Sequence, residues 1–306
     1  MLWDKDALLG KAKSYIQRAF EDESRDSDRF PFWGTIGLEF VGRAVLAGVH
    51  PCLLADPQSP EAVLFACGIG DASNAKSVHA KTVFARCGLI VVDFTKSDFA
   101  FCMSLMERRN EELHTAAAAF EGFSTEKWLA DYYRVLEKLL KHLKLDLAGV
   151  LTDGDAKAAT QMVAAASKAL LAEVKKKVAD HKTAFGTLRP ETIVERRSAF
   201  KLKPPSFRGP TKTVKCPACN EDCLVSGEIV RSTDPKLAGD ELFWESIVLP
   251  NILRCDVCGL ELKGHEALHI AEVGGQFSML RWRDAAEYYL EGVDPSRYFE
   301  EEYNNS

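Results

Sequence analysis

The sequence lacks the features that mark secreted and membrane-spanning chains. Its first 15 residues contain neither the apolar run nor the small-residue cleavage site of a signal peptide. The longest apolar stretch, around residues 45–55, is interrupted by His50 and Pro51 and is too short to cross a bilayer. We therefore expect a cytoplasmic protein with no membrane partner.

The sequence also lacks a net positive charge and internal repetition. The 306 residues carry a formal net charge of −6, so no overall basic field draws the chain to nucleic acid, and any such contact must come from a local patch. The sequence has no internal repeat, and its longest low-complexity tract is the four alanines at 116–119. With 46% hydrophobic and 27% charged residues, this composition is that of an ordinary globular protein, and its length favours two domains over one.

The nine cysteines do not have the pattern of a disulfide framework, because their number is odd, their spacing uneven and the chain large. Four are scattered through apolar helical segments, where we expect small buried thiols in a reducing compartment: Cys52, Cys67, Cys87 and Cys102. The other five are clustered near the C-terminal end of the chain: Cys216, Cys219, Cys223, Cys255 and Cys258. This cluster needs a separate explanation.

Two Cys-x-x-Cys pairs within the cluster predict a zinc ribbon. The pairs are Cys216 with Cys219 and Cys255 with Cys258, and each tight turn aims two sulfurs at one point. Strand-like segments precede both pairs, and no βαβ pattern supports the alternative of a thioredoxin-like dithiol. Four thiolates fill the tetrahedral shell of Zn²⁺, so the predicted metal is structural.

Three further residues near the ribbon are weaker candidates for metal binding. Cys223 is more simply a spare thiol, and His265 with His269, one helical turn apart, offer at most a second site.

Helical periodicity dominates the first 200 residues. The spacing of apolar residues predicts helices over 3–22, 35–49, 73–87, 94–120 and 124–146, then a long helix over 152–185 and a short one over 190–200. We expect a mainly α protein with an N-terminal helical bundle at 1–150 and a helical connector at 151–203. A small β-rich zinc ribbon at 204–275 follows, and then a C-terminal helix with an acidic tail at 276–306.

A local basic run is hidden by the negative net charge. Seven Lys or Arg and no Asp or Glu lie between residues 196 and 215. Such a run is often only a solvated linker. If it contacts RNA, the candidate phosphate-binding residues are Arg196, Arg197, Lys201 and Lys203, with Arg108 on an earlier helix.

The segment "MERRNEELHTAAAAF", residues 106–120, contains Arg109, Asn110 and His114. Its simplest interpretation is a solvated helix surface, on which charged residues four positions apart form pairs. Asn110 and His114 share one side of the helix, whereas Arg109 and His114 are about 140° apart. A compact site built from both therefore needs two copies of the helix.

In this helical setting, residues 1–150 resemble the HEPN superfamily (higher eukaryotes and prokaryotes nucleotide-binding domain). Members are helical bundles with Arg-x4–6-His late in the bundle, often with Asn directly after Arg, as in Arg109, Asn110 and His114. The segment at 32–51 is similar to the family's second helix, whose acidic residue falls on Glu39. The zinc ribbon has no counterpart in this resemblance and is interpreted as an appended module.

The resemblance implies a homodimer that cleaves RNA without a catalytic metal. His114 would act as general base or acid, and Arg109 would hold the phosphate. Asn110 would orient His114 or bind phosphate, and Glu39 would hold Arg109. The products would be a 2′,3′-cyclic phosphate and a 5′-OH.

Such chains resemble toxins or antiphage effectors, with a protein trigger or inhibitor as partner. Two alternatives remain open. One is a non-catalytic nucleic-acid or protein-binding module that uses the zinc ribbon, and the other is a transcription-linked zinc-ribbon protein.

Overall fold

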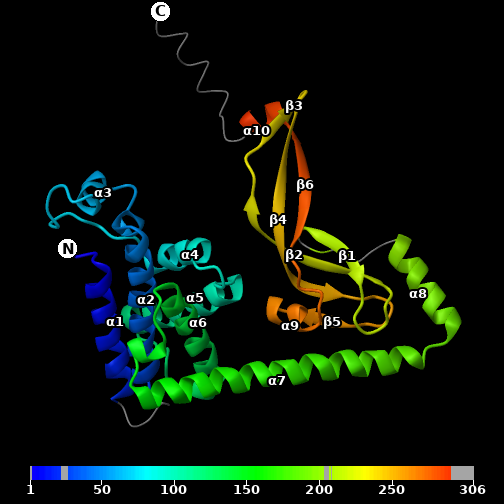
Figure 1. Cartoon of the computed structure of the whole chain (residues 1–306), viewed down its shortest axis with the longest axis horizontal. Coiled ribbons are helices and arrows are strands. Elements are labelled where there is room, and N and C mark those ends of the chain that lie inside the picture. The colour runs from blue at the N-terminus through cyan, green and yellow to red at the C-terminus, as the bar shows by residue number, and fades with distance from the viewer. Residues whose placement is uncertain (1, 22–26, 203–206, 208, 291–306) are drawn as a thin grey trace, which may run out of the picture. The chain divides into compact units, whose positions relative to one another are not determined.

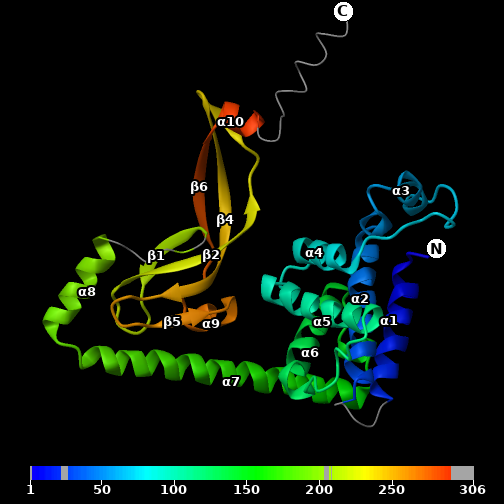
Figure 2. The same cartoon turned by 180° about the vertical axis from the view of Figure 1, so that it is seen from behind.

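The computed structural model describes residues 2–21, 27–202, 207 and 209–290 (Figures 1 and 2). Lys203, one of the predicted RNA contacts, and the acidic tail from residue 291 lie outside these ranges. The chain forms two compact units, Met1–Ser167 and Lys168–Ser306. The first unit is helical and the second is built on an antiparallel sheet, so the expectation of a mainly α chain with a β-rich C-terminal part is confirmed.

Helix α2 (Arg29–Val49) forms the centre of the first unit and contacts α1 (Lys5–Phe20), α4 (Ala80–Ile90), α5 (Lys96–His114) and α6 (Leu129–His142). Shorter elements connect these helices: η1 (Pro51–Leu54), α3 (Pro60–Ala66), η2 (Thr125–Lys127) and η3 (Leu147–Gly149). The apolar run in α2 is longer than we expected, and by length and composition this helix could cross a membrane. However, 61% of its 18-residue apolar window is buried within the protein, as in the core helix of a globular domain.

Close packing of α1 on α2 depends on a glycine. A Cβ atom placed on Gly37 would lie 2.5 Å from Cγ1 of Ile16, which is closer than real side chains approach. Ile16 and Ala12 are fully buried on the facing side of α1. The absence of a side chain at Gly37 therefore lets the two helix backbones come together.

Two helix starts differ from the prediction by six or more residues, and α6 begins at Leu129 instead of residue 124. Helix α2 begins at Arg29 instead of residue 35, because Pro31 lies in the first turn, where proline costs no intrahelical hydrogen bond. Helix α4 begins at Ala80 instead of residue 73. Ser73 is held in a turn by Asp71, and Ser77 forms a β-bridge with Ala55, so this segment is not available to the helix.

Helix α5 ends at His114, six residues before the predicted end at Phe120. Thr115 is extended and its hydroxyl accepts the amide of Ala117. The carboxylate of Glu112 accepts the amide of Ala119, and Arg108 donates to the Ala119 carbonyl. These contacts satisfy backbone groups that a longer helix would have paired, so the alanine run leaves the helix despite its high helical propensity.

The long helix α7 (Asp153–Gly186) belongs to both units. Ala156 and Ala159 are buried in the core of the first unit. After Ser167 the helix belongs to the second unit, where Val174 is buried, and α8 (Pro190–Leu202) belongs to the same unit. The predicted connector at 151–203 is therefore shared between the two units and is not a separate body.

The second unit contains six antiparallel strands: β1 (Thr211–Lys215), β2 (Asp222–Ser232), β3 (Lys236–Ala238), β4 (Glu241–Arg254), β5 (Glu261–Lys263) and β6 (Phe277–Asp284). Strand β4 is central, with β2 and β3 on one edge and β5 and β6 on the other. Two short helices complete the unit, α9 (His265–Ile270) and α10 (Ala285–Leu290). Strand β6 occupies the first part of the segment 276–306, where we predicted a C-terminal helix and tail, and the helix α10 follows it. The buried Phe277 and half-buried Met279 of β6 follow the two-residue period of a strand.

Candidate functional site

Glu39 joins two arginines in the first unit. Its Oε2 accepts from Nη1 of Arg109 at 2.8 Å, and its Oε1 accepts from Nη2 of Arg43 at 2.7 Å. The side chain of Glu39 is only 10% exposed, that of Arg109 17% and that of Arg43 13%. A carboxylate so well desolvated and so fully hydrogen-bonded fixes both guanidinium groups in place. Arg109 thus lies in contact with Glu39, 70 residues away in sequence.

Three elements hold this group. Glu39 and Arg43 lie one turn apart on α2, and Arg109 comes from α5. Arg43 also donates to the Val78 carbonyl at 3.0 Å and to the Ser77 hydroxyl at 3.2 Å, so it connects α2 to the segment before α4. Sequence reasoning missed Arg43, although its spacing of four residues from Glu39 on a predicted helix was a usable signal.

The position of α5 is fixed at its first turn. Thr95 and Asp98 form a complete capping box. The fully buried carboxylate of Asp98 also accepts from Arg134 at 2.6 Å and Lys138 at 2.8 Å, both on α6. Because these contacts lock α5 against α6, the position of Arg109 further along the helix is set as well.

A groove of about 770 Å³ opens beside the ion-paired group. Its lining includes three cations, Lys11, Arg43 and Arg109, and the single carboxylate of Glu39. Ser77 and apolar side chains, among them Phe40, form the rest, and Nζ of Lys11 lies 4.6 Å from the centre of the Phe40 ring. The excess of positive charge in a partly apolar groove favours an anionic ligand with a flat or apolar portion.

The structure does not bring His114 to this group within one chain. His114 is the last residue of α5, is exposed and does not line the groove. Asn110 is also exposed, and its Oδ1 accepts from Nε of Arg109 at 3.0 Å instead of contacting His114. One chain therefore assembles Glu39, Arg109 and Asn110, and leaves His114 exposed.

Arg108, a predicted RNA contact, is held by contacts within the protein. Its Nη1 donates to the Ala119 carbonyl at 2.7 Å, and its guanidinium lies 4.3 Å from the centre of the Phe123 ring. These contacts fasten the segment after α5. A role in phosphate binding would have to compete with them.

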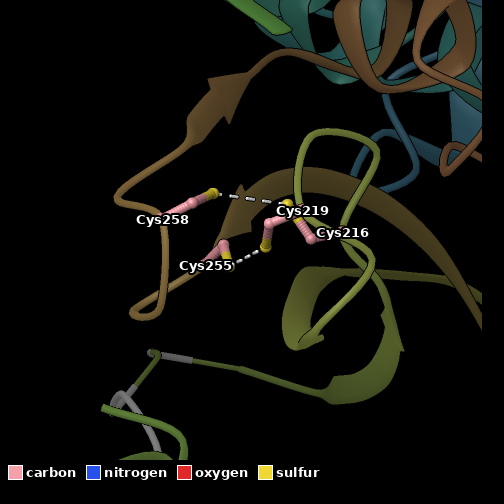
Figure 3. A group of neighbouring side chains, drawn as sticks. All are labelled: Cys216, Cys219, Cys255 and Cys258. Atoms are coloured by element: carbon pink, nitrogen blue, oxygen red, sulfur yellow. Dashed lines mark hydrogen bonds between the residues drawn. The ribbon is translucent and has the colours of Figure 1, made fainter. Parts of the chain in front are cut away.

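The four predicted metal ligands come together in the second unit (Figure 3). The sulfurs of Cys216, Cys219, Cys255 and Cys258 all lie within 4.8 Å of one another, and the pairs Cys216–Cys258 and Cys219–Cys255 are each 3.6 Å apart. The first pair follows β1 and the second follows β4. Four converging sulfurs can hold a metal ion, as the spacing predicted.

The two cysteine turns have the same backbone design. The amide of Asn220 donates to the Cys216 carbonyl at 2.9 Å, and the amide of Gly259 donates to the Cys255 carbonyl at 2.8 Å. Both donors are in the left-handed region, with φ of +60° at Asn220 and +77° at Gly259. Glycine pays no steric penalty there and asparagine only a small one, which explains both residue types.

The surroundings of the sulfurs shift the pKa values of the cysteine thiols in opposite directions. Burial raises the pKa of Cys219 to about 12, whereas hydrogen bonds from Cys223, Cys255 and Cys258 lower the pKa of Cys216. Cys223 is fully buried beside the cluster but is not one of the four converging ligands. His265 and His269 have ring centres 6.2 Å apart and do not belong to the cluster either.

The basic run contacts the cysteine turns. Nη1 of Arg196 donates to the Val257 carbonyl at 2.9 Å, and Arg197 forms two hydrogen bonds with Glu221, at 2.6 and 2.8 Å. On α7, Nδ1 of His181 lies 3.0 Å from the carbonyl of Cys258. Helices α7 and α8 are thus fastened to the cysteine turns by contacts that the sequence did not reveal. The predicted RNA contacts Arg196, Arg197 and Lys201 are all exposed, but the first two are held by these hydrogen bonds.

The isolated thiols differ from the expectation that all four are buried. Cys87 and Cys102 are buried, but Cys52 is half-buried and Cys67 is exposed. Cys67 follows directly after α3, at the surface, where its side chain no longer faces the core.

Comparison with known proteins gives no relative: no family model, curated protein or solved structure matches this chain. Functional inference must therefore start from the chemistry of these two groups, the arginine–glutamate groove of the first unit and the four-cysteine cluster of the second.

Proposed function

We propose that this protein is a metal-independent endoribonuclease of the HEPN type that acts as a homodimer. It would cleave RNA by attack of the 2′-OH on the adjacent phosphate, leaving a 2′,3′-cyclic phosphate and a 5′-OH. The observation that supports this proposal is the buried Glu39–Arg109 pair at the edge of a cationic groove.

Arg109 is well placed to bind a phosphate. A guanidinium has five N–H donors, and the contacts with Glu39 and Asn110 use two of them. The other donors can hold phosphate oxygens and offset the charge that develops in the phosphorane. Lys11 and Arg43, in the same groove, add positive charge along the path of the RNA backbone.

His114 is the group that can move protons. Its exposed position at the end of α5 suits a site that forms between two chains. In such a site the imidazole of one copy could lie beside Arg109 of its own chain or of the partner chain. An imidazole can serve as base toward the 2′-OH and as acid toward the leaving 5′ oxygen.

Zn²⁺ fits the four-cysteine cluster. With Zn–S bonds of about 2.3 Å, a tetrahedral site has sulfur–sulfur edges of about 3.8 Å, close to the 3.6 Å of two pairs here. Cys216, Cys219, Cys255 and Cys258 would hold the ion and fill its coordination shell. The metal would therefore stabilise the ribbon and take no part in cleavage.

As a cellular role we propose a cytoplasmic toxin or antiphage effector, controlled by a protein trigger or inhibitor. RNA recognition would involve the groove of the first unit, with Lys201 and Lys203 as additional candidate contacts.

The test is cleavage of a single-stranded RNA by purified protein with EDTA present, followed by analysis of the product ends. We expect cyclic phosphate and 5′-OH ends, and a loss of about 10²-fold or more in His114→Ala. His79→Ala is the matched control, because His79 is exposed and its side chain does not cap α4. Wild-type cleavage by His114→Ala would overturn the proposal.

A second candidate function is non-catalytic binding through the zinc ribbon. It is favoured by an aromatic pair on the sheet, in which Phe243 and Trp282 are register partners with ring centres 5.1 Å apart and Trp282 is 51% exposed. Binding of RNA or protein that Trp282→Ala abolishes, without any cleavage by the wild type, would support this function.

A further inference from the structure

Cys52 and Cys67 form a close thiol pair outside both groups described above. Their sulfurs lie 3.4 Å apart, although 15 residues separate them in sequence. Cys52 is in η1, directly after α2, and Cys67 ends α3. Cys67 is exposed and Cys52 half-buried, so an oxidant in solution reaches the pair through Cys67.

The geometry suits a covalent bond. Two bonded sulfurs are about 2.05 Å apart, so the gap must close by only about 1.4 Å. Cys52 is the second residue of η1 and Cys67 caps the end of α3, and the exposed residues Pro57 and Gln58 lie between these two short elements. We propose that Cys52 and Cys67 form a reversible disulfide, which makes this pair a thiol–disulfide exchange site.

The bond forms by exchange with a low-molecular-weight disulfide such as oxidised glutathione. The thiolate of Cys67 attacks one sulfur of glutathione disulfide, forms a mixed disulfide and releases one glutathione thiolate. The thiolate of Cys52 then attacks the Cys67 sulfur, forms the internal disulfide and releases the second glutathione. The protein loses two electrons and two protons, and glutathione disulfide is reduced to two glutathione thiols.

The other described thiols are less suited to this exchange. Cys87 and Cys102 are fully buried, so an oxidant in solution does not reach them. Four of the remaining five cysteines converge as metal ligands, and the fifth, Cys223, is fully buried beside them. In the metal-loaded protein, oxidation is therefore directed to Cys52 and Cys67.

The disulfide would close a loop that adjoins the groove. Leu54, in the same 3-10 turn as Cys52, lines the groove, and its carbonyl accepts the amide of Val78 at 2.9 Å. Arg43 in turn donates to the Val78 carbonyl. Oxidation thus constrains the segment that contains Leu54, and this segment is hydrogen-bonded to Val78, the residue whose carbonyl accepts from Arg43. The proposed pairing itself does not depend on the ribonuclease proposal.

The experiment treats the full-length, zinc-loaded protein with oxidised glutathione, blocks free thiols and digests the chain. Trypsin leaves both cysteines in one peptide, 44–76, so additional cleavage after Glu61 is needed to separate them. We expect two peptides that stay joined until dithiothreitol is added. Alkylation of both cysteines, or a glutathione adduct on Cys67 as the final product, would overturn the proposal.

Two variants sharpen the test. In Cys52→Ser we expect the glutathione adduct on Cys67 to accumulate, because the resolving thiol is missing, and Cys87→Ser should form the linked peptides as the wild type does. If the adduct on Cys67 reaches the same low level with and without Cys52, then Cys52 does not resolve it and the pairing is refuted.

Discussion

A single carboxylate, that of Glu39, keeps two buried arginines in place at the groove. Removing its charge leaves Arg43 and Arg109 facing each other with little solvent to screen them. Breaking a buried ion pair from one side typically costs about 3–5 kcal/mol, because the remaining charge is uncompensated. For Glu39→Gln we therefore expect a loss of that order in the free energy of unfolding, measured by urea denaturation.

Glu111→Gln is the matched control for that measurement. Glu111 is an exposed carboxylate on α5, the helix that carries Arg109, and its removal should change the free energy of unfolding by less than about 0.5 kcal/mol. Equal stabilities of the two variants would mean that the Glu39 pairs contribute nothing to the fold.

The packing of α1 against α2 predicts how alanine substitutions at two glycines change the stability of the first unit. Gly37→Ala places a methyl group against Ile16, and we expect it to destabilise the first unit by about 1–3 kcal/mol through overpacking. Gly10→Ala, on the same pair of helices, meets nothing within 4 Å. It should instead stabilise the unit by up to about 1 kcal/mol, because alanine favours a helix over glycine.

Thermal unfolding of both glycine variants provides the measurement. The melting temperature should fall for Gly37→Ala and rise or stay constant for Gly10→Ala. A rise of equal size in both would show that helix propensity, not contact between α1 and α2, governs these positions.

Elements whose signal is local were predictable from the sequence. The cysteine turns are set by residues within four positions of one another, and the bounds of α7 match the prediction to one residue at each end. The end of α5 was not predictable, because Arg108 and Glu112 stop the helix through contacts with Ala119, and such contacts override the helical propensity of alanine. Strand β6 was missed because its partner β4 lies far away in sequence.

In the candidate site, residue types were easier to predict than their partners. Glu39 and Arg109 were identified through the resemblance, and the structure adds their contact. Arg196 and Arg197 were interpreted as RNA ligands from charge alone, since sequence cannot show that the Val257 carbonyl and Glu221 lie within reach. Long-range hydrogen bonds of this kind decide whether a basic residue is free to bind a ligand.

For the molecule as a whole, metal removal should affect the two units differently. The core of the second unit contains the four ligands, whereas that of the first is a separate apolar cluster. After chelation with a strong zinc ligand, we expect amide hydrogen exchange to accelerate over residues 211–263. Residues 29–49 should stay protected, because structural zinc supplies folding energy only where its ligands lie.

RNA cleavage gives a second measurement on the chelated protein. The proposed chemistry uses no metal, so cleavage by the first unit should persist. Loss of protection in α2 after chelation would show instead that the two units fold as one.

The matching left-handed residues of the two cysteine turns also define a way to recognise distant relatives. Only glycine, asparagine and occasionally aspartate adopt that backbone conformation readily, so chains with this ribbon should keep Cys-x-x-Cys followed by one of them, twice. Between the turns, residues 230–241 are exposed and can change freely in length and composition, whereas much of β2 and β4 packs into the core of the second unit. A search that ignores overall identity and requires both five-residue patterns, together with Glu39 and the Arg109–His114 spacing on preceding helices, would find homologues that whole-chain comparison misses.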